Sequence, residues 1–140
     1  MGATDEAAVT AYLAELNGEQ WDAAQIERAL DYLSPEVRYH IYAWEDPMIG
    51  RDAIRAEWLR QAELFHDFRS EIATIGSVGQ TVFVEKREFM TLTGTPVTLH
   101  IVDVFEMDRD GKIAVWRDFS DSREVAVKVG VDLAAQDRAS

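Results

Sequence analysis

Apolar residues recur at helical spacing in the first half of the chain and predict three helices. The first begins at Thr4, a residue suited to capping a helix, and ends at Asn17-Gly18. The second runs from residue 21 or 22 to about residue 33, where Ser34-Pro35 ends it. The third spans residues 51–68. Its predicted inward-facing residues are Ile54, Trp58, Ala62, Phe65 and Phe68, and those of the first helix are Val9, Tyr12, Leu13 and Leu16.

Alternation of apolar and polar residues predicts a strand over residues 36–44, with Val37, Tyr39, Ile41 and Ala43 on one face. After residue 68 the period changes from helical to two. The predicted strands are residues 69–78, 81–92, 97–108 and 112–120, and the turns between them contain Gly or Pro as hairpins do. Residues 122–129 are predicted to form a short closing helix.

This order of elements favours an α+β fold, in which a curved antiparallel sheet is covered on one side by helices. Short hairpin turns join antiparallel neighbours, and the helices must bury their apolar stripes against the sheet. A chain of 140 residues is too short for two full-sized cores. We therefore expect one domain over residues 1–140, with its core at about residues 5–129 and a C-terminal tail at 130–140.

The chain has 14 basic and 26 acidic residues, a formal net charge of -12 and no Cys. This charge argues against nucleic acid and anionic membranes as partners, because Lys and Arg supply most of the affinity for phosphates. Without Cys there can be no disulfide, thiol nucleophile or thiolate metal site. The sequence shows neither a basic leader nor an apolar run long enough to cross a bilayer. We expect a cytoplasmic protein.

Several charged residues share strand faces with apolar ones. Lys86 and Glu88 lie on the same face of their predicted strand as Val82, Val84 and Met90. Asp103 shares a face with Leu99, Ile101 and Phe105. Asp118 shares a face with Ala114, Trp116 and Ser120. Both faces of these strands contain apolar residues, so alternation alone leaves open which face points inward.

If the charged faces form one concave surface, three carboxylates and one ammonium converge on it. Burying them costs several kcal/mol per ion unless they pair or share protons. Such a cluster suits acid–base chemistry, because one carboxyl keeps its proton while another stays ionised. Three alternatives stay open. Lys86 and Glu88 could belong to a solvated cross-strand charge pattern in an exposed hairpin, Asp103 could be a structural, hydrogen-bonded acid, and Asp118 could simply pair with Arg117, Lys86 or Arg123. The three His residues lack metal-site spacing, so we predict no metal and no cofactor.

The turn and strand at residues 111–121, with the pattern GKI..WRDF.D, and the helix start GRDAI at 50–54 resemble a known family. It is the SnoaL-like and limonene-1,2-epoxide-hydrolase-like branch of the nuclear transport factor 2-like superfamily. The resemblance covers roughly residues 5–129. It implies a cone-shaped α+β barrel with a cystatin-like sheet, a deep apolar pocket enclosed by the sheet and helices, and a homodimer or other homo-oligomer.

Limonene-epoxide-hydrolase-like enzymes use an Asp-Arg-Asp set, helped by a Tyr and an Asn, to activate water and protonate the epoxide. By position the resemblance matches one Asp to Asp118 and the Tyr to Tyr39. The Arg position holds Lys86, the other Asp position Glu88 and the Asn position Ile41. Lys lacks the planar fork with which Arg bridges two carboxylates, and Ile41 cannot position water. These departures weigh against epoxide hydrolysis.

We therefore predict a cofactor-independent acid–base enzyme for a small, largely apolar and possibly hydroxylated aromatic substrate. Loss of water or of a small carbonyl fragment, or an isomerisation, fits best; epoxide hydrolysis and a non-catalytic carrier are the alternatives. Asp118 is predicted as general base, Glu88 as general acid or its partner, and Lys86 as the group that stabilises a substrate oxygen. The predicted substrate-binding residues are Tyr39, Asp103, Ile41, Leu99, Ile101, Trp116 and Met90. An assembly protein that dimerises through Phe83, Phe89 and Val115 is compatible with either role.

Overall fold

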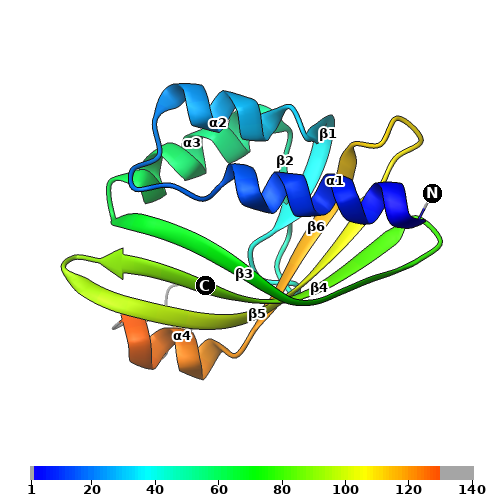
Figure 1. The fold of residues 1–140 in the computed structure, drawn as a ribbon. Helices are drawn as coiled ribbons and strands as arrows, with labels where there is room; N and C mark the ends of the chain where they lie inside the picture. Colours follow the sequence, from blue (N-terminus) through cyan, green and yellow to red (C-terminus); the bar gives the residue numbers. More distant parts are fainter. Residues whose placement is uncertain (1, 130–140) are drawn as a thin grey trace.

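A computed structural model describes residues 2–129 of the chain (Figure 1). Within that range the helices are α1 (Gly2–Glu15), α2 (Ala23–Leu30), α3 (Arg51–Ala62) and α4 (Ser122–Val129). The strands are β1 (Leu33–His40), β2 (Met48–Ile49), β3 (Phe65–Val78), β4 (Thr81–Leu92), β5 (Thr95–Met107) and β6 (Ile113–Ser120). The predicted α+β class is confirmed, and the predicted tail at 130–140 lies outside the described residues.

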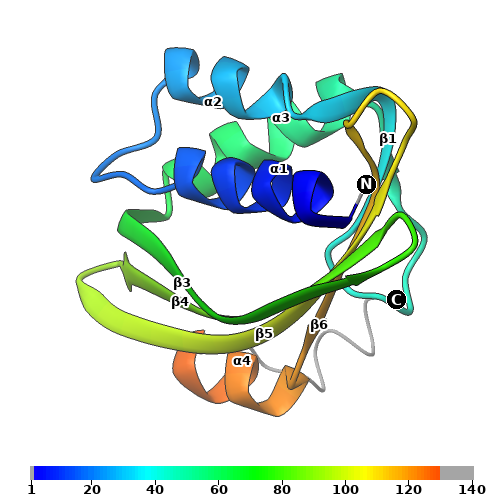
Figure 2. The ribbon, with the colours of Figure 1, turned by 45° about the vertical axis from the view of Figure 1, so that its right-hand side comes forward.

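The strands form one curved sheet in the order β2-β1-β6-β5-β4-β3. Helices α1, α2 and α3 cover its concave face, here called the inner face, and α4 lies on the other side along β5 (Figures 1 and 2). The sheet is mixed, because β1 runs parallel to β6, whereas the sequence predicted antiparallel pairing throughout. No hairpin joins β1 to β6, so the turn rules that orient the other strands do not apply to this pair.

The third helix is shorter than predicted. It ends at Ala62, and residues 65–68 already belong to β3. Phe65 and Phe68 do face inward, as expected, since both rings lie edge-on to Trp21 at 5.0 and 5.4 Å between centroids. These aromatic residues extend the apolar spacing of the helix past its end, which explains the wrong boundary.

Other boundaries moved by a few residues. Helix α1 begins at Gly2, so Thr4 lies inside its first turn and does not cap it. Strand β1 starts at Leu33 and ends at His40, earlier than the predicted residues 36–44 at both ends. The two-residue strand β2, which pairs with β1 through Met48 and Tyr39, was not predicted. Strand β4 and helix α4 have the predicted bounds.

Aromatic residues fill the space between the inner face and the helices. Trp116 of β6 stacks on Tyr39 of β1 at 3.9 Å and on Phe105 of β5 at 5.8 Å between ring centroids. We call Tyr39, Trp116 and Phe105 the aromatic row. Tyr12 of α1 and Trp58 of α3 cover the row, and all five side chains are buried. This packing fixes how α1 and α3 lie over the charged part of the sheet.

Helix α4 continues from the end of β6 and lies beside the part of β5 that β6 no longer covers. The Glu124 carboxylate accepts hydrogen bonds from the backbone N–H of His100 at 2.7 Å and joins the His100 ring at 2.8 Å. The Lys128 ammonium donates to the Thr98 carbonyl at 2.8 Å. The helix thereby satisfies backbone groups that a missing strand would leave unpaired. Among the described helices, none is long and apolar enough to cross a membrane.

Candidate active site

The charged faces of β4, β5 and β6 point inward. Strand pairing sets Lys86 of β4 opposite Ile101 of β5, and Asp103 of β5 opposite Asp118 of β6. Paired residues of neighbouring strands share a face of the sheet, so Lys86, Asp103 and Asp118 lie together on the inner face. Lys86 is 2% exposed and Asp103 is fully buried. The reading of Lys86 and Glu88 as a solvated surface pair is therefore wrong.

Lys86 joins two carboxylates. Its ammonium Nζ lies 2.6 Å from Oδ2 of Asp103 and 2.9 Å from Oε2 of Glu88. Burial alone would lower the pKa of Lys86, but the charges of Asp103 and Glu88 outweigh it and raise that pKa above its ordinary value. Lys86 is thus a fixed cation, which agrees with the predicted electrostatic role and not with an amine nucleophile.

Asp118 stands on the other side of Asp103. Its Oδ2 accepts a hydrogen bond of 2.7 Å from the Tyr39 hydroxyl. Burial, the charge of Asp103 and a hydrogen bond to Asp103 raise the pKa of Asp118 well above its usual range, although Lys86 acts in the opposite direction. Two adjacent carboxyl groups cannot both ionise cheaply in a buried place, so the Asp103–Asp118 pair keeps a proton.

The four side chains lie in a row, from Glu88 through Lys86 and Asp103 to Asp118, and together they are called the charged set. Glu88 and Asp118, at the two ends of the row, are partly buried, whereas Lys86 and Asp103 between them are fully buried. The arrangement offers a carboxyl group with a raised pKa at Asp118 and a second carboxyl group at Glu88 that contacts the ammonium. This is the pairing that acid–base chemistry requires.

The other predicted binding residues are distributed around this set. Tyr39 and Trp116 belong to the aromatic row, and Ile41 is partly buried against the same core. Leu99 and Ile101 lie in a second apolar cluster with Val97, which Val125 and Val129 of α4 also contact. Met90 packs against both clusters. The structure thus places all of the predicted binding residues on or beside the inner face, and Asp103 among them at the centre of the charged set.

Sequence reasoning treated Tyr12 only as a core residue of the first helix. Its hydroxyl is buried without a hydrogen-bond partner, as is the indole Nε1 of Trp116. The helical stripe correctly placed the Tyr12 ring in the core, but periodicity carries no information on what a buried hydroxyl contacts.

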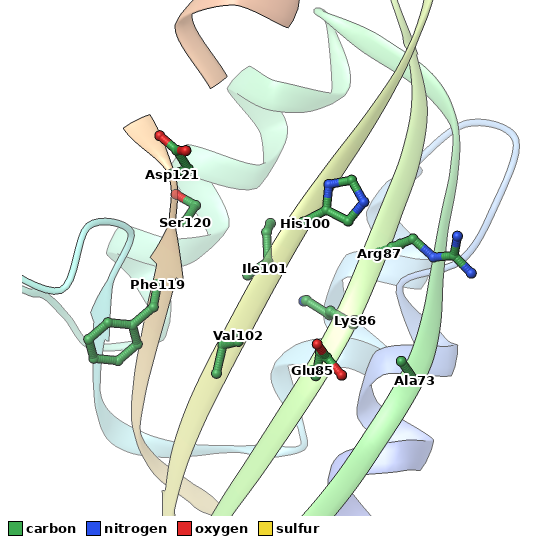
Figure 3. A pocket seen from close by; sticks show the side chains of 10 residues that line it. All are labelled: Ala73, Glu85, Lys86, Arg87, His100, Ile101, Val102, Phe119, Ser120 and Asp121. Carbon is green, nitrogen blue, oxygen red and sulfur yellow. The ribbon is translucent and has the colours of Figure 1, made fainter. Parts of the chain in front are cut away.

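A groove of about 510 Å³ lies on the outer face of the same strands (Figure 3). Its lining includes Glu85, Arg87, His100, Val102 and Phe119. Lys86 borders the groove, but its ammonium lies on the inner face with Asp103. The exposed residues Phe83, Val102 and Phe119 make this outer face partly apolar. Dimerisation through Phe83, Phe89 and Val115 stays a prediction. On the inner face beside the charged set, where the resemblance implies a deep apolar pocket, the structure has packed aromatic side chains.

Within residues 2–129, no group of three or more His, Asp or Glu side chains is arranged to hold a metal ion. His100 pairs with Glu124 and His66 with Asp67, both at the surface. Neither histidine lies in the charged set.

The shared proton predicts a pH effect on stability. An Asp side chain in the unfolded chain has a pKa of about 4, and in the folded chain the pKa of Asp118 is higher. The folded chain therefore binds this proton more strongly than the unfolded chain does. As a result, the free energy of unfolding decreases as the pH rises from about 4 through the raised pKa. Asp118→Asn cannot ionise and still presents an oxygen to Tyr39. We expect the variant to gain stability relative to the native chain as the pH increases, which urea unfolding at pH values between about 4 and 9 will measure. A constant difference would mean that Asp118 is ionised in the folded chain.

A family model described as SnoaL-like domain matches residues 9–116. No curated protein matches the sequence. Among solved structures, an M. tuberculosis LEH-like epoxide hydrolase superimposes with a TM-score of 0.76 at 22% identity, over 99% of this chain and 98% of that chain. At this level of identity the structural match shows a shared fold, and it agrees with the fold expected from the sequence resemblance.

Proposed function

Since the chain belongs to the SnoaL-like domain family, we propose that it is a cofactor-independent enzyme that moves protons on a small, largely apolar substrate bearing oxygen. The observation that carries this proposal is the buried contact of the Lys86 ammonium with Asp103, which pairs across the strands with Asp118; burial and Asp103 raise the pKa of Asp118 well above its usual range. Burying a cation and three carboxyl groups is costly, and a protein that needed only a stable core would fill the same volume with apolar side chains.

The roles of the two accessible carboxyl groups follow from their protonation. Asp118 keeps a proton and receives a hydrogen bond from Tyr39, so it acts as the general acid toward a substrate oxygen. Glu88, whose carboxylate contacts the Lys86 ammonium at 2.9 Å, acts as the general base. This reverses the sequence-based assignment, in which Asp118 was the base. Lys86 stabilises negative charge that develops on the substrate.

Loss of water, or an isomerisation, fits this set best. Glu88 removes a proton from carbon, and Asp118 gives its proton to the departing or rearranging oxygen, so after one turnover Glu88 has gained one proton and Asp118 has lost one, and exchange with solvent restores both. Neither reaction needs a fixed water molecule. Ile41, partly buried against the core beyond the end of β1, offers no hydrogen bond for positioning one.

Epoxide hydrolysis is the second candidate, because Asp103 contacts Lys86 and pairs across the strands with Asp118. Lys86 contacts both Asp103 and Glu88, which sets two carboxyl groups around one cation, similar to the Asp-Arg-Asp set of the resembling enzymes. In that reaction Asp118 protonates the epoxide oxygen and Glu88 takes a proton from the attacking water.

The substrate would reach the charged set past two methionines. Met48 is paired with Tyr39 across β1 and β2, and Met90 lies two residues beyond Glu88 on β4. Both are partly buried, and the unbranched, flexible Met side chain changes conformation at little cost. Movement of these two side chains would open apolar space next to Glu88 and Asp118.

The test is turnover by the purified protein, without added metal or cofactor, of three substrate sets: epoxides, aryl diols and hydroxyketones. Reactions run in water labelled with oxygen-18 distinguish the two candidates. A hydrolase adds one labelled oxygen to the product, whereas elimination or isomerisation adds none. We expect an unlabelled dehydrated or isomerised product. A labelled diol would replace the first candidate by the second, and binding of panel members with no turnover at all would favour a carrier.

A further inference from the structure

The Ser70 hydroxyl is a buried polar group that packing does not explain. Ser70 lies on β3, and its Oγ has no hydrogen-bond partner among the described residues. Leaving a buried hydroxyl unpartnered costs about 1–3 kcal/mol. Two residues before and two after it along the strand, Phe68 and Ile72 pack against the apolar core. An apolar side chain at position 70 would continue this row without that cost, so the hydroxyl is expected to serve another group.

Strand pairing sets Ser70 opposite Glu88 of β4, just as it sets Ile72 opposite Lys86. Residues paired in this way share a face of the sheet, and their Cβ atoms lie about 4.5–5.5 Å apart. Ser70 is therefore on the inner face, beside the proposed general base. Lys86 contacts Oε2 of the Glu88 carboxylate at 2.9 Å. A carboxylate has about four lone-pair sites, so the Glu88 group can accept a second donor.

The same two strands contain a contact of this kind on the outer face. Thr74 of β3 is paired with Glu85 of β4, and its hydroxyl donates a hydrogen bond of 3.2 Å to Oε1 of that carboxylate. Ser70 and Glu88 repeat this combination of hydroxyl and carboxylate on the inner face. A serine hydroxyl has three staggered positions about the Cα–Cβ bond, and a change between them moves the oxygen without moving the backbone.

The backbone of Ser70 is held on both sides. Strand β3 is the last strand of the sheet, so its outer edge has no neighbouring strand to bond. The segment after α1 covers this edge, where Asn17 Oδ1 accepts the N–H of Ser70 at 2.9 Å. Gly18 exchanges two hydrogen bonds of 2.9 Å with Phe68. Ser70 therefore presents its side chain to Glu88 from a fixed place, as a residue that orients a catalytic group must.

We propose that Ser70 is a positioning residue for Glu88, whose carboxylate accepts a hydrogen bond from the Ser70 hydroxyl after a change of the serine rotamer. The role rests on the proposed function, in which Glu88 is the general base. With Lys86 and Ser70 as two donors at fixed places, the carboxylate is held in one orientation toward the substrate.

The hydrogen bond is tested by a double-mutant cycle on stability, which needs no substrate. Ser70→Ala, Glu88→Met and the double variant are unfolded in urea beside the native chain. We expect the two substitutions to be non-additive, with a coupling of about three- to tenfold in the unfolding equilibrium constant. Thr74→Ala combined with Glu88→Met is the matched control and should be additive, because Thr74 contacts Glu85 on the outer face. Additive effects in the Ser70 cycle would overturn the inference.

Turnover measurements distinguish the orientation of a catalytic group from a merely structural contact. Ser70→Ala should lower kcat about three- to tenfold with KM unchanged. Ser70→Thr keeps the hydroxyl and should restore most of the rate, and Thr74→Ala should have the rate of the native chain. A raised KM at unchanged kcat would also contradict the inference, because the hydroxyl would then bind the substrate and not orient the base.

These outcomes are distinct from a failure of the proposed function. Coupling in the Ser70 cycle, without turnover of any substrate by the native chain, would keep the hydrogen bond and remove the enzymatic role of both residues. Turnover by the native chain, with additive stability effects and an unchanged kcat in Ser70→Ala, would remove the role of Ser70 and leave the proposed function in place.

Discussion

Replacing Lys86 by Met is expected to destabilise the folded chain by about 3–5 kcal/mol, the cost of leaving a buried charge without its partner. Met preserves most of the volume and the unbranched shape of the side chain, so the loss comes mainly from charge. Without the ammonium, Asp103 is left buried with no cation beside it, and Glu88 loses the contact at 2.9 Å. Equilibrium unfolding in urea at neutral pH measures the difference.

The matched control for Lys86→Met is Arg87→Met. Arg87 is the next residue of β4, on the outer face, and its side chain is 53% exposed. Removing this exposed cation should change stability by less than about 1 kcal/mol. An equal loss in both variants would show that the charge of β4, and not the inner site, determines the effect.

The Lys86→Met penalty should also depend on pH. In folded Lys86→Met the pKa of the buried carboxyl groups is higher than in the unfolded chain. The free energy of unfolding of this variant therefore decreases as the pH rises above about 4. In the native chain the Lys86 ammonium lowers the pKa of Asp118, against the effects of burial and of Asp103, so its removal raises that pKa further. The difference between the two chains is therefore expected to be small near pH 4 and full near pH 8. A pH-independent penalty would point to lost packing.

The sequence was most informative where one pattern had one structural solution. Alternation between two Gly-containing turns correctly predicted the bounds of β4 at residues 81–92. The predicted closing helix at residues 122–129 is also confirmed, as α4. The prediction of a helix at residues 65–68 was wrong. Over so few positions, inward-facing aromatic residues are compatible with a helix and with a strand equally well. The parallel pairing of β1 with β6 joins distant parts of the chain, and no local turn specifies it.

The centre of the site depends on a single irregularity in pairing. Met107 pairs with Ile113, whereas Glu106 pairs with Val115, so one extra residue of β6 is inserted next to the turn. This bulge sets Asp103 opposite Asp118. With unbroken register Asp103 would face Arg117, and Asp118 would point to the outer face. The sequence shows that Asp103 and Asp118 are acids, but it does not show that they lie side by side. For that reason Asp103 was predicted only as a substrate-binding residue, and Glu88 was predicted as the general acid.

Asp118→Asn is expected to reduce turnover by about 10²–10⁴-fold, the usual contribution of a positioned general acid or base. Asn still accepts the hydrogen bond from Tyr39 and can donate one to Asp103, so the inner face keeps its arrangement while the transferable proton is lost. Substrate affinity should change little, since the two groups have similar size. Initial rates and ligand affinity for the same substrate, measured on one preparation, test both statements.

Two further variants show whether the proton of Asp118 is what matters. Glu85→Gln removes a carboxylate from the outer face of β4, where Thr74 contacts it at 3.2 Å, and should leave turnover unchanged. Asp118→Glu keeps an acid and should retain more activity than Asp118→Asn.

If Asp118 is the acid, the native rate falls as the pH rises through its raised pKa, because the ionised form has no proton to give. A rate that instead increases over that range would make Asp118 the base, as the sequence alone suggested, and would transfer the role of acid to another member of the set.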